Sequence, residues 1–366
     1  MEIEAIRGLY RRSQPFAELT EFLENKRKKC IFLEGLLASS APLLLSAITA
    51  PSPFLIIMND DEEAGYFYHD LSQILGTGQV LFFPSPYRNS RKYSEKDAAN
   101  EILRTEVLAR LSSYETTQGP LFVVTHPQAV GEKVVSRQKL NENTLQLRVG
   151  ESIDISFIEE TLTAFGFEQV DYVYEPGQFA VRGSIVDVFS FSCEYPFRID
   201  FFGDDVDSIR TFDVQTQLSR ERKDQIEIVS NLCDDTEELI PFIDVLPNET
   251  IVTLRNMSFV CEMVEDEEFT RRLLDFKRIE LRKPKGQKES ASSICFNITA
   301  QPLFHKDFNM LTSTLEDYIA KGYRLYILAD SSKQQQRLKE IFEDKSRFIT
   351  FTPVDKTLHE GFADNN

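Results

Sequence analysis

The stretch from Gly35 to Pro42 stands where a phosphate-binding loop would be expected. A short apolar strand, residues 29–34, precedes this run of small residues, and a leucine-rich helix follows it. The motif GxxxxGK followed by Ser or Thr needs a lysine for the terminal phosphates and a hydroxyl for magnesium. With Gly35 as the first glycine, Ser39 lies in the loop and Ser40, Ala41 and Pro42 take the glycine, lysine and hydroxyl positions. Because the cation, the hydroxyl and one amide are lost, we predict a degenerate loop that has lost most of its phosphate binding and is not an ATPase.

An alternative is that Gly35–Pro42 was never a phosphate loop and is only a turn before a helix. Asp60–Glu63 follows a second apolar strand, residues 54–58, and imitates the acidic pair of a nucleotide site. Without the lysine these carboxylates have no metal and phosphate to organise, so we interpret them as the solvated N-terminus of a helix.

A second group of residues with chemical potential lies in Glu175–Phe212. Apolar side chains recur at every second position in Phe179 and Val181 and again in Phe197, Ile199 and Phe201. This alternation predicts a hairpin with one buried face, with a bulge at Gly183 and a turn at Ser192–Pro196.

Arg182, Arg198 and Asp200 then fall on the opposite face of that hairpin. Planar donors, aromatic area and charges of both signs are typical of protein interfaces. A half-solvated hairpin whose arginines bind nothing is the alternative, since any antiparallel sheet shows charges to water.

Composition favours a folded acidic protein of several domains. The chain has 366 residues, 42% hydrophobic residues and 29 Phe, enough for two to four cores. Its formal net charge is -18, from 59 acidic and 41 basic residues, whereas binding to a phosphate backbone needs a cationic surface. Nucleic acid is therefore not the expected ligand of this chain.

Neither cysteines nor histidines predict a metal site. The five cysteines are widely spaced without a CxxC pair, which favours reduced thiols in a cytoplasmic protein, and the four histidines lack ligand spacing. The most apolar stretch, Ala38–Ala50, is short for a bilayer and contains Pro42, so we predict a buried helix and no membrane association.

The hairpin region resembles a known family. It is similar to the second domain shared by the excision-repair protein UvrB and the bacterial transcription-repair coupling factor (Mfd) family. The likeness depends on a long run of residues at fixed spacing: Pro176, Gly177, Phe179, Val181, Arg182, Gly183, Asp187, Phe189, Arg198, Phe201, Phe202, Gly203, Asp204, Asp205, Ile209, Arg210, Phe212 and Asp213.

The resemblance implies that this domain docks the repair protein UvrA. Contacts to UvrA would then come from Arg182 and Arg198 as donors, Asp200 as an acceptor, and the aromatic rings of Phe179 and Phe202. UvrB has a further arginine shortly before its hairpin, where this sequence has Glu168 and Gln169.

The resemblance also implies four segments. Residues 1–125 and 214–293 would form an α/β domain with a parallel sheet of the RecA-like, P-loop type. Residues 126–213 would form an inserted α+β docking domain, and residues 294–366 a further small α/β domain that ends in mid-domain. Ile251–Leu254 reads as a strand of the first sheet, Met263–Leu281 as a charged helix, and Lys283–Ser293 as a linker.

Two functions are compatible with this resemblance. The first is a non-catalytic adaptor that recruits UvrA to stalled RNA polymerase; ATP, magnesium, DNA and polymerase would be bound only by parts of a longer protein outside this chain. The second is a UvrB-like ATP-dependent DNA helicase component. Ala41 favours the adaptor, as does the short Phe82–Tyr93 stretch, which lacks the long aromatic hairpin with which UvrB holds damaged DNA.

Overall fold

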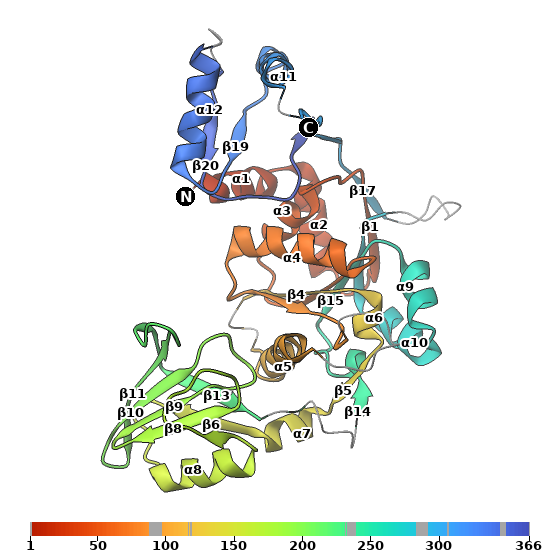
Figure 1. Ribbon diagram of the computed structural model, residues 1–366. Helices are drawn as coiled ribbons and strands as arrows, with labels where there is room; N and C mark the ends of the chain where they lie inside the picture. Colours follow the sequence, from red (N-terminus) through yellow and green to blue (C-terminus); the bar gives the residue numbers. More distant parts are fainter. Residues whose placement is uncertain are drawn as a thin grey trace.

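The computed structural model describes residues 2–87, 97–115, 117, 119–230, 232, 239–282, 292–305, 307–344 and 349–365. These residues form three units (Figure 1): a first unit around a seven-stranded sheet, a second around a six-stranded sheet, and a small third unit near the C-terminus. Residues 88–93 of the Phe82–Tyr93 stretch and residues 283–291 of the expected linker lie outside this description.

Seven parallel strands form the sheet of the first unit, in the order β17-β1-β16-β15-β2-β4-β3. Their bounds are Cys30–Glu34 (β1), Pro53–Ile57 (β2), Val80–Phe83 (β3), Leu121–Thr125 (β4), Ile251–Leu254 (β15), Lys277–Glu280 (β16) and Ser293–Cys295 (β17). Strands β2, β4 and β15 are buried along their whole length, because helices cover both faces of this parallel sheet. The predicted α/β class with a large parallel sheet is confirmed.

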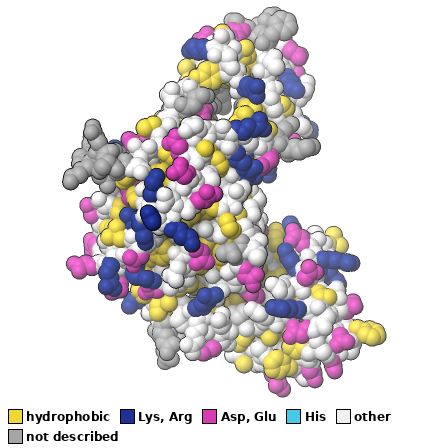
Figure 2. All heavy atoms as spheres, turned by 180° about the vertical axis from the view of Figure 1, so that it is seen from behind, with side chains coloured by type: hydrophobic (Ala, Val, Ile, Leu, Met, Phe, Trp, Pro, Cys, Tyr) yellow, Lys and Arg dark blue, Asp and Glu magenta, His cyan; other side chains and the backbone are white. Residues whose placement is uncertain are grey.

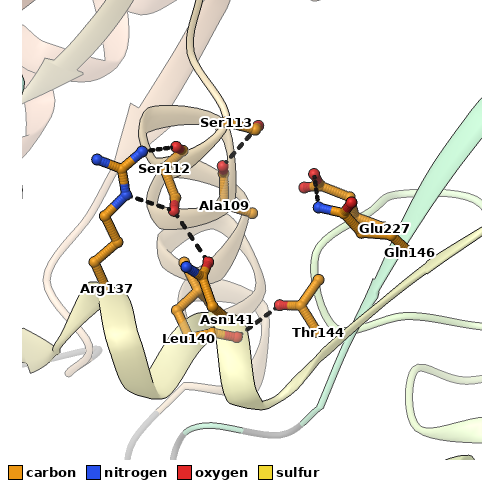
Figure 3. Close-up of a pocket in the computed structure, with 9 residues that line it drawn as sticks. All are labelled: Ala109, Ser112, Ser113, Arg137, Leu140, Asn141, Thr144, Gln146 and Glu227. Atoms are coloured by element: carbon orange, nitrogen blue, oxygen red, sulfur yellow. Dashed lines mark hydrogen bonds between the residues drawn. The ribbon is translucent and has the colours of Figure 1, made fainter.

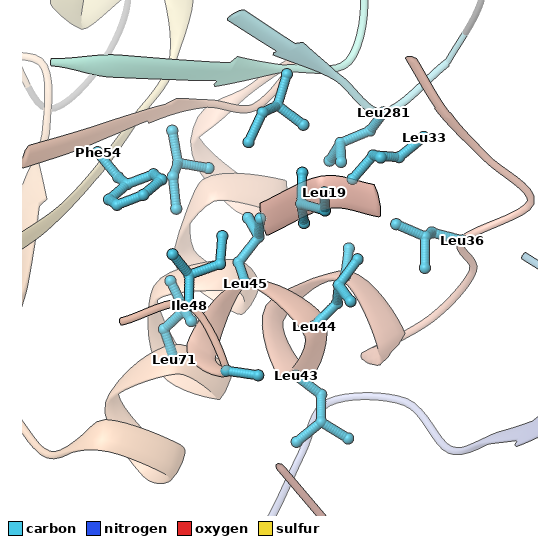
Figure 4. Close-up of a cluster of buried hydrophobic side chains, with 14 of the residues drawn as sticks. Leu19, Leu33, Leu36, Leu43, Leu44, Leu45, Ile48, Phe54, Leu71 and Leu281 are labelled. Atoms are coloured by element: carbon cyan, nitrogen blue, oxygen red, sulfur yellow. The ribbon is translucent and has the colours of Figure 1, made fainter. Parts of the chain in front are cut away.

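Helices pack on both faces of this sheet. One face carries α1 (Glu2–Arg11), α2 (Gln14–Glu24), α3 (Ser40–Ser46) and α4 (Asp61–Leu75). The other carries α5 (Ala98–Ser112), α6 (Pro127–Val130), the 3-10 turn η2 (Phe242–Asp244), α9 (Met257–Val264) and α10 (Glu267–Asp275). Figure 4 shows how the leucines of α3 fill the space between the sheet and α4, which makes α3 the most deeply buried helix of this face.

The long charged helix predicted over Met263–Leu281 is wrong. Glu265 adopts a left-handed conformation with φ 54° and ends α9, and the Asp266 carboxylate then caps α10 by accepting from the amides of Glu268 and Phe269. The last residues of the expected helix form β16, which lies between β1 and β15.

The second unit lies between β4 and β15 along the chain. Its sheet has the order β12-β11-β10-β9-β8-β7, and a separate antiparallel pair, β6 with β13, completes it. The elements are β6 (Thr144–Arg148), α8 (Ile155–Ala164), β7 (Glu168–Gln169), β8 (Gln178–Arg182), β9 (Ile185–Val188), β10 (Phe197–Phe202), β11 (Asp205–Phe212), β12 (Ser219–Lys223) and β13 (Gln225–Val229). One face of the sheet packs on α8 through a core that includes Phe179, Ile199 and Leu162.

Instead of a single hairpin, this region forms a meander of four antiparallel strands, β8 to β11, and the predicted turn at Ser192–Pro196 lies between β9 and β10. Gly183 is not a bulge: it has φ +62° and forms, with Ser184, the turn between β8 and β9. Strand β9 therefore separates β8 from β10, and Gly203 forms a second turn between β10 and β11.

The boundaries of the second unit also differ from the predicted 126–213. Residues 127–142, with α6, β5 (Lys133–Val135) and α7 (Arg137–Glu142), contribute to the core of the first unit, and β5 pairs with β14 (Leu239–Pro241). At the other end, β12 and β13 belong to the second unit, which therefore runs from Thr144 to Val229. Every residue of β12 is exposed, so the sequence of this edge strand lacks the apolar alternation by which strands are recognised.

The third unit is small. It contains α11 (Phe308–Ala320), β19 (Tyr326–Leu328), α12 (Ser332–Asp344) and β20 (Thr352–Val354), and its two strands pair in parallel. Between the first and third units, β18 (Ile298–Ala300) pairs with β21 (Phe362–Asp364). The predicted boundary at residue 293 is too early, because β17 is a strand of the first sheet.

Residues 355–361, which we call the strap, pass beside α1 and α3 on their way from β20 to β21 (Figure 1). The Glu360 amide donates to Ser39 Oγ at 3.0 Å, and the Ser39 amide donates to the Glu360 carbonyl at 3.4 Å. The His359 ring stacks on Tyr66 with centroids 3.5 Å apart, and its amide donates to the buried Asp70 carboxylate at 2.7 Å. The strap thus covers the Gly35–Pro42 loop.

Asp70 links the strap to the pH dependence of stability. Burial raises the pKa of its carboxyl, and hydrogen bonds from Ser39 and the His359 amide lower it only in part. A raised pKa means that the folded state binds the proton more readily, so the native protein loses stability as the pH rises through this titration. We therefore expect the unfolding free energy of Asp70→Asn, relative to that of the native protein, to increase as the pH rises above about 4. At higher pH the difference should become constant, and urea unfolding at several pH values measures it.

Asp154→Asn is the matched control with the opposite sign. Hydrogen bonds from the hydroxyl and amide of Ser156 lower the pKa of Asp154, so this carboxylate stabilises the fold above its ordinary pKa and loses that effect as the pH falls. A difference between Asp70→Asn and the native protein that does not change with pH would contradict the assignment.

Candidate protein-docking face

The outer face of the six-stranded sheet carries the charged residues that the sequence singled out. Strand alternation along β10 buries Phe197, Ile199 and Phe201 on the α8 side and leaves Arg198 and Asp200 on the other. In the sheet register, Arg198 lies beside Asp187 of β9 on one side and beside Arg210 of β11 on the other. We call this side, away from α8, the docking face.

Asp187 is the centre of this face. Its carboxylate is 1% exposed and accepts hydrogen bonds from Arg198 Nε at 2.7 Å and Arg198 Nη2 at 2.8 Å. The same carboxylate also accepts from Arg182 Nη2. One buried anion therefore holds two guanidinium groups in place, and the face keeps one net positive charge from these three residues.

Arg198 is held from several sides. Its guanidinium lies 4.3 Å from the centroid of the Phe212 ring and donates to Gln217 Oε1 at 3.1 Å. The hydrogen bonds to Asp187 raise the pKa of Arg198, although burial opposes this shift. Its side chain is 14% exposed, so it presents only the edge of its guanidinium to a partner.

Arg182 is more accessible than Arg198, with a side chain that is 35% exposed. Its Nη1 donates to the Asp171 carbonyl at 2.8 Å, and its guanidinium lies 5.1 Å from the centroid of the Tyr172 ring. These contacts fix the direction of the side chain without burying it, which suits an arginine that must meet a partner already oriented.

Asp200 and Phe202 continue the face along β10. The Asp200 carboxylate pairs with Arg210 and accepts from Ser208 Oγ at 2.9 Å. Phe202 is 82% exposed, the highest value among the large hydrophobic side chains of the described residues. An aromatic ring left in water at the end of a charged strand is a typical contact residue of an interface.

The structure brings together four of the five residues predicted to bind UvrA and removes the fifth. Phe179 is 1% exposed and packs in the core beneath the sheet, so it cannot touch a partner. Its place in the alternation, on the side opposite Arg182, already indicated this. The sequence did not reveal Asp187 as the partner of Arg198, because β9 lies between the two segments expected to form one hairpin. Arg210, the partner of Asp200, lies on β11, on the other side of β10.

The Gly35–Pro42 loop uses its own polar groups. Ser40 Oγ donates to the Leu37 carbonyl at 2.6 Å and accepts from the Leu37 amide, and Ser39 binds the strap. Gly35 has φ +85°, and a Cβ there would lie 2.1 Å from the Phe296 carbonyl oxygen. Ala41 and Pro42 are buried in α3. The backbone that would surround a phosphate thus contacts other parts of the same chain.

A cavity of about 310 Å³ remains beside this loop, with an acidic lining. Its carboxylates are Asp60, Glu62, Glu63, Asp70 and Glu360, and the arginine that lines it, Arg255, pairs with Glu63. Asp60 caps α4 by accepting from the Glu63 amide, as expected for a helix N-terminus. An anionic phosphate would meet mainly like charge here.

A second cavity, of about 470 Å³, lies where α5 and α7 meet β6 and β13 (Figure 3). Figure 3 shows its polar side chains paired across the walls: Arg137 Nε donates to Ser112 Oγ at 3.1 Å, and Gln146 Nε2 donates to Glu227 at 3.2 Å. The first of these bonds lies within the first unit and the second within the second unit. Thr144 Oγ1 of β6 links the two units by donating to the Leu140 carbonyl of α7 at 2.7 Å.

Residues 2–87 and the further described ranges contain neither a group of His, Cys, Asp and Glu that could hold a metal ion nor a helix long and apolar enough to cross a bilayer.

Asp187→Asn tests whether the buried carboxylate holds the docking face together. The Asn side chain has only one acceptor oxygen, and its NH2 group would point toward the two arginine guanidiniums in place of the second carboxylate oxygen. We therefore expect the unfolding free energy to fall by about 3 kcal/mol. Asp200→Asn is the control: its pair with Arg210 is partly in water, and we expect a loss of about 1 kcal/mol or less. Urea denaturation of both variants measures this, and equal losses would contradict the central place of Asp187.

Comparison with known proteins places the second unit in a family. Residues 145–232 match the family model described as the UvrB interaction domain, nearly the same residues as the structural unit from Thr144 to Val229. A transcription-repair-coupling factor of Haemophilus influenzae is 38% identical over 198 residues, which is 54% of this chain and 17% of that protein.

Two further relatives point the same way. The transcription-repair-coupling factor of Bacillus subtilis is 27% identical over 228 residues, 62% of this chain and 19% of that protein. The UvrABC system protein B of Lactococcus lactis is 29% identical over 217 residues, 56% of this chain and 31% of that protein. The matches thus span less than a fifth of these two coupling factors. This chain therefore carries a UvrB interaction domain at residues 145–232, and it is similar to the N-terminal UvrB-homology region of bacterial transcription-repair coupling factors.

Proposed function

We propose that this chain is a non-catalytic adaptor that recruits UvrA to stalled RNA polymerase in transcription-coupled nucleotide excision repair. The docking face carries this proposal: Arg182 and Arg198 held on one buried carboxylate, beside an exposed Phe202, within the residues that match the UvrB interaction domain. A rigid cationic and aromatic surface suits a protein partner with exposed carboxylates and an apolar recess.

The rest of the proposal concerns what other parts of a longer protein would do. RNA polymerase, DNA, ATP and magnesium would be bound outside this chain, and this part would work in the cytoplasm without a cofactor. Its net charge of -18 supports a protein partner over nucleic acid.

The alternative is a UvrB-like ATP-dependent helicase component. Three features argue against nucleotide binding: Ala41 and Pro42 replace the lysine and hydroxyl residue of the loop, the strap is bound to Ser39, and the neighbouring cavity is acidic. Titration with a fluorescent ATP analogue and magnesium should give no saturable signal, whereas magnesium-dependent binding would favour the helicase component.

UvrA binding is tested most cleanly at Phe202 and Arg182. Phe202 is so exposed that Phe202→Ala should change the unfolding free energy by less than about 0.5 kcal/mol while weakening UvrA binding about tenfold or more. Arg182→Glu should abolish binding, since it reverses the charge that a carboxylate on UvrA would meet. Both are measured by calorimetry with purified UvrA.

Leu303→Ala is the control, because Leu303 is 77% exposed but lies outside the second unit. Native-like UvrA affinity in both Phe202→Ala and Arg182→Glu, or no UvrA binding by the native protein, would refute the proposed docking face.

A further inference from the structure

Two tyrosines lie at the edge of the docking face, on the segment between β7 and β8. Tyr172 is 54% exposed and Tyr174 is 59% exposed, whereas Val173 between them is 1% exposed. The segment therefore buries the Val173 side chain in the protein and leaves the rings of Tyr172 and Tyr174 exposed to water.

The backbone of this segment is held firmly. Val173 packs with Ala180, Phe189 and Phe212 in a small apolar cluster. Gln178 Oε1 accepts from the amides of Tyr174, at 2.9 Å, and Glu175, at 3.1 Å. Exposed aromatic side chains on an ordered backbone lose little conformational entropy on binding, which makes them efficient contact residues.

This apolar cluster lies on the same side of the sheet as the arginines. Ala180 alternates with the buried Phe179 along β8 and so faces away from α8, and Phe212 also carries the Arg198 guanidinium. Arg182 contacts the segment directly, through the Asp171 carbonyl and the Tyr172 ring. The tyrosines therefore continue the docking face beyond Arg182.

The distances suit a single partner. β7 pairs in parallel with β8, so Tyr172 leaves the sheet edge beside Arg182, and β10 with Phe202 is three strand positions away from this edge. At a strand spacing of about 4.8 Å, this separation is roughly 14 Å. An interface of ordinary size covers about 800 Å² on each partner, so both aromatic groups fit beneath one footprint.

Figure 2 shows hydrophobic side chains among basic and acidic ones on the second unit, at the lower right. Such a surface combines rigid apolar area with donors, whereas a solvated face would be mostly charged.

We propose that Tyr172 and Tyr174 form a second aromatic contact of the UvrA-docking face, on the side of Arg182 opposite Phe202. This inference rests on the proposed function, and it assigns the tyrosines as contact residues for UvrA. Tyr172 also orients Arg182, whereas Tyr174 contacts UvrA independently of that arginine.

The experiment compares Tyr172→Ala, Tyr174→Ala and the double variant in the full chain by calorimetry with purified UvrA. We expect each single change to weaken binding about threefold to tenfold and the double change more than tenfold, with unaltered thermal unfolding because both rings are more than half exposed. When Arg182 is already replaced by Ala, Tyr174→Ala should still weaken UvrA binding further. Tyr172→Ala should then cause a smaller loss of affinity than it causes when Arg182 is present.

Phe157→Ala is the matched control. Phe157 is 52% exposed on α8, which covers the other face of the same sheet, so its removal should leave UvrA affinity unchanged. Should the double tyrosine variant bind UvrA as the native protein does while Phe202→Ala does not, the tyrosine contact is wrong and the docking face stands. If the native protein fails to bind UvrA, both proposals fail together.

Discussion

The docking face depends on a single ionic interaction, the pairing of the Asp187 carboxylate with two arginines. Two guanidiniums side by side repel each other, and a buried carboxylate without partners would be unstable. Together the three groups satisfy one another and leave a surplus positive charge at the surface. Arg198 is turned inward and Arg182 outward, so one arginine mainly supports the arrangement and the other is free to meet a partner.

This arrangement needs a rigid support, and the second unit provides it on both sides of the sheet. Beneath the sheet, α8 packs on an apolar core; above it, Val173 and Phe212 form a smaller cluster against which Arg198 lies. The first unit also uses its polar groups internally. Its Gly35–Pro42 loop contacts Phe296 and the strap, so the polar groups of this loop hold parts of the same chain together.

Much of the first sheet could be predicted from sequence, because strands such as Pro53–Ile57 are continuous apolar runs. Strand β16 could not: Lys277, Arg278 and Glu280 look like a solvated helix, yet Glu280 is 4% exposed beside Arg278 and Cys30. Cys30 and the neighbouring strand β1 lie about 250 residues earlier in the chain, so no local pattern reveals the strand. Strand alternation was enough to place Arg198 and Asp200 on the outer face of the sheet, but the pairing of Arg198 with Asp187 depends on the order of the strands.

The strand order of the first sheet has a consequence for biosynthesis. Strand β1 pairs only with β16 and β17, which the ribosome makes after the whole second unit. All strands of the second unit, by contrast, pair with one another. The second unit can therefore fold as soon as residue 229 has left the exit tunnel, while the apolar strand Cys30–Glu34 waits without a neighbour. During translation the second unit is therefore complete before the sheet of the first unit, and β1 stays an unpaired apolar strand until β16 has been made.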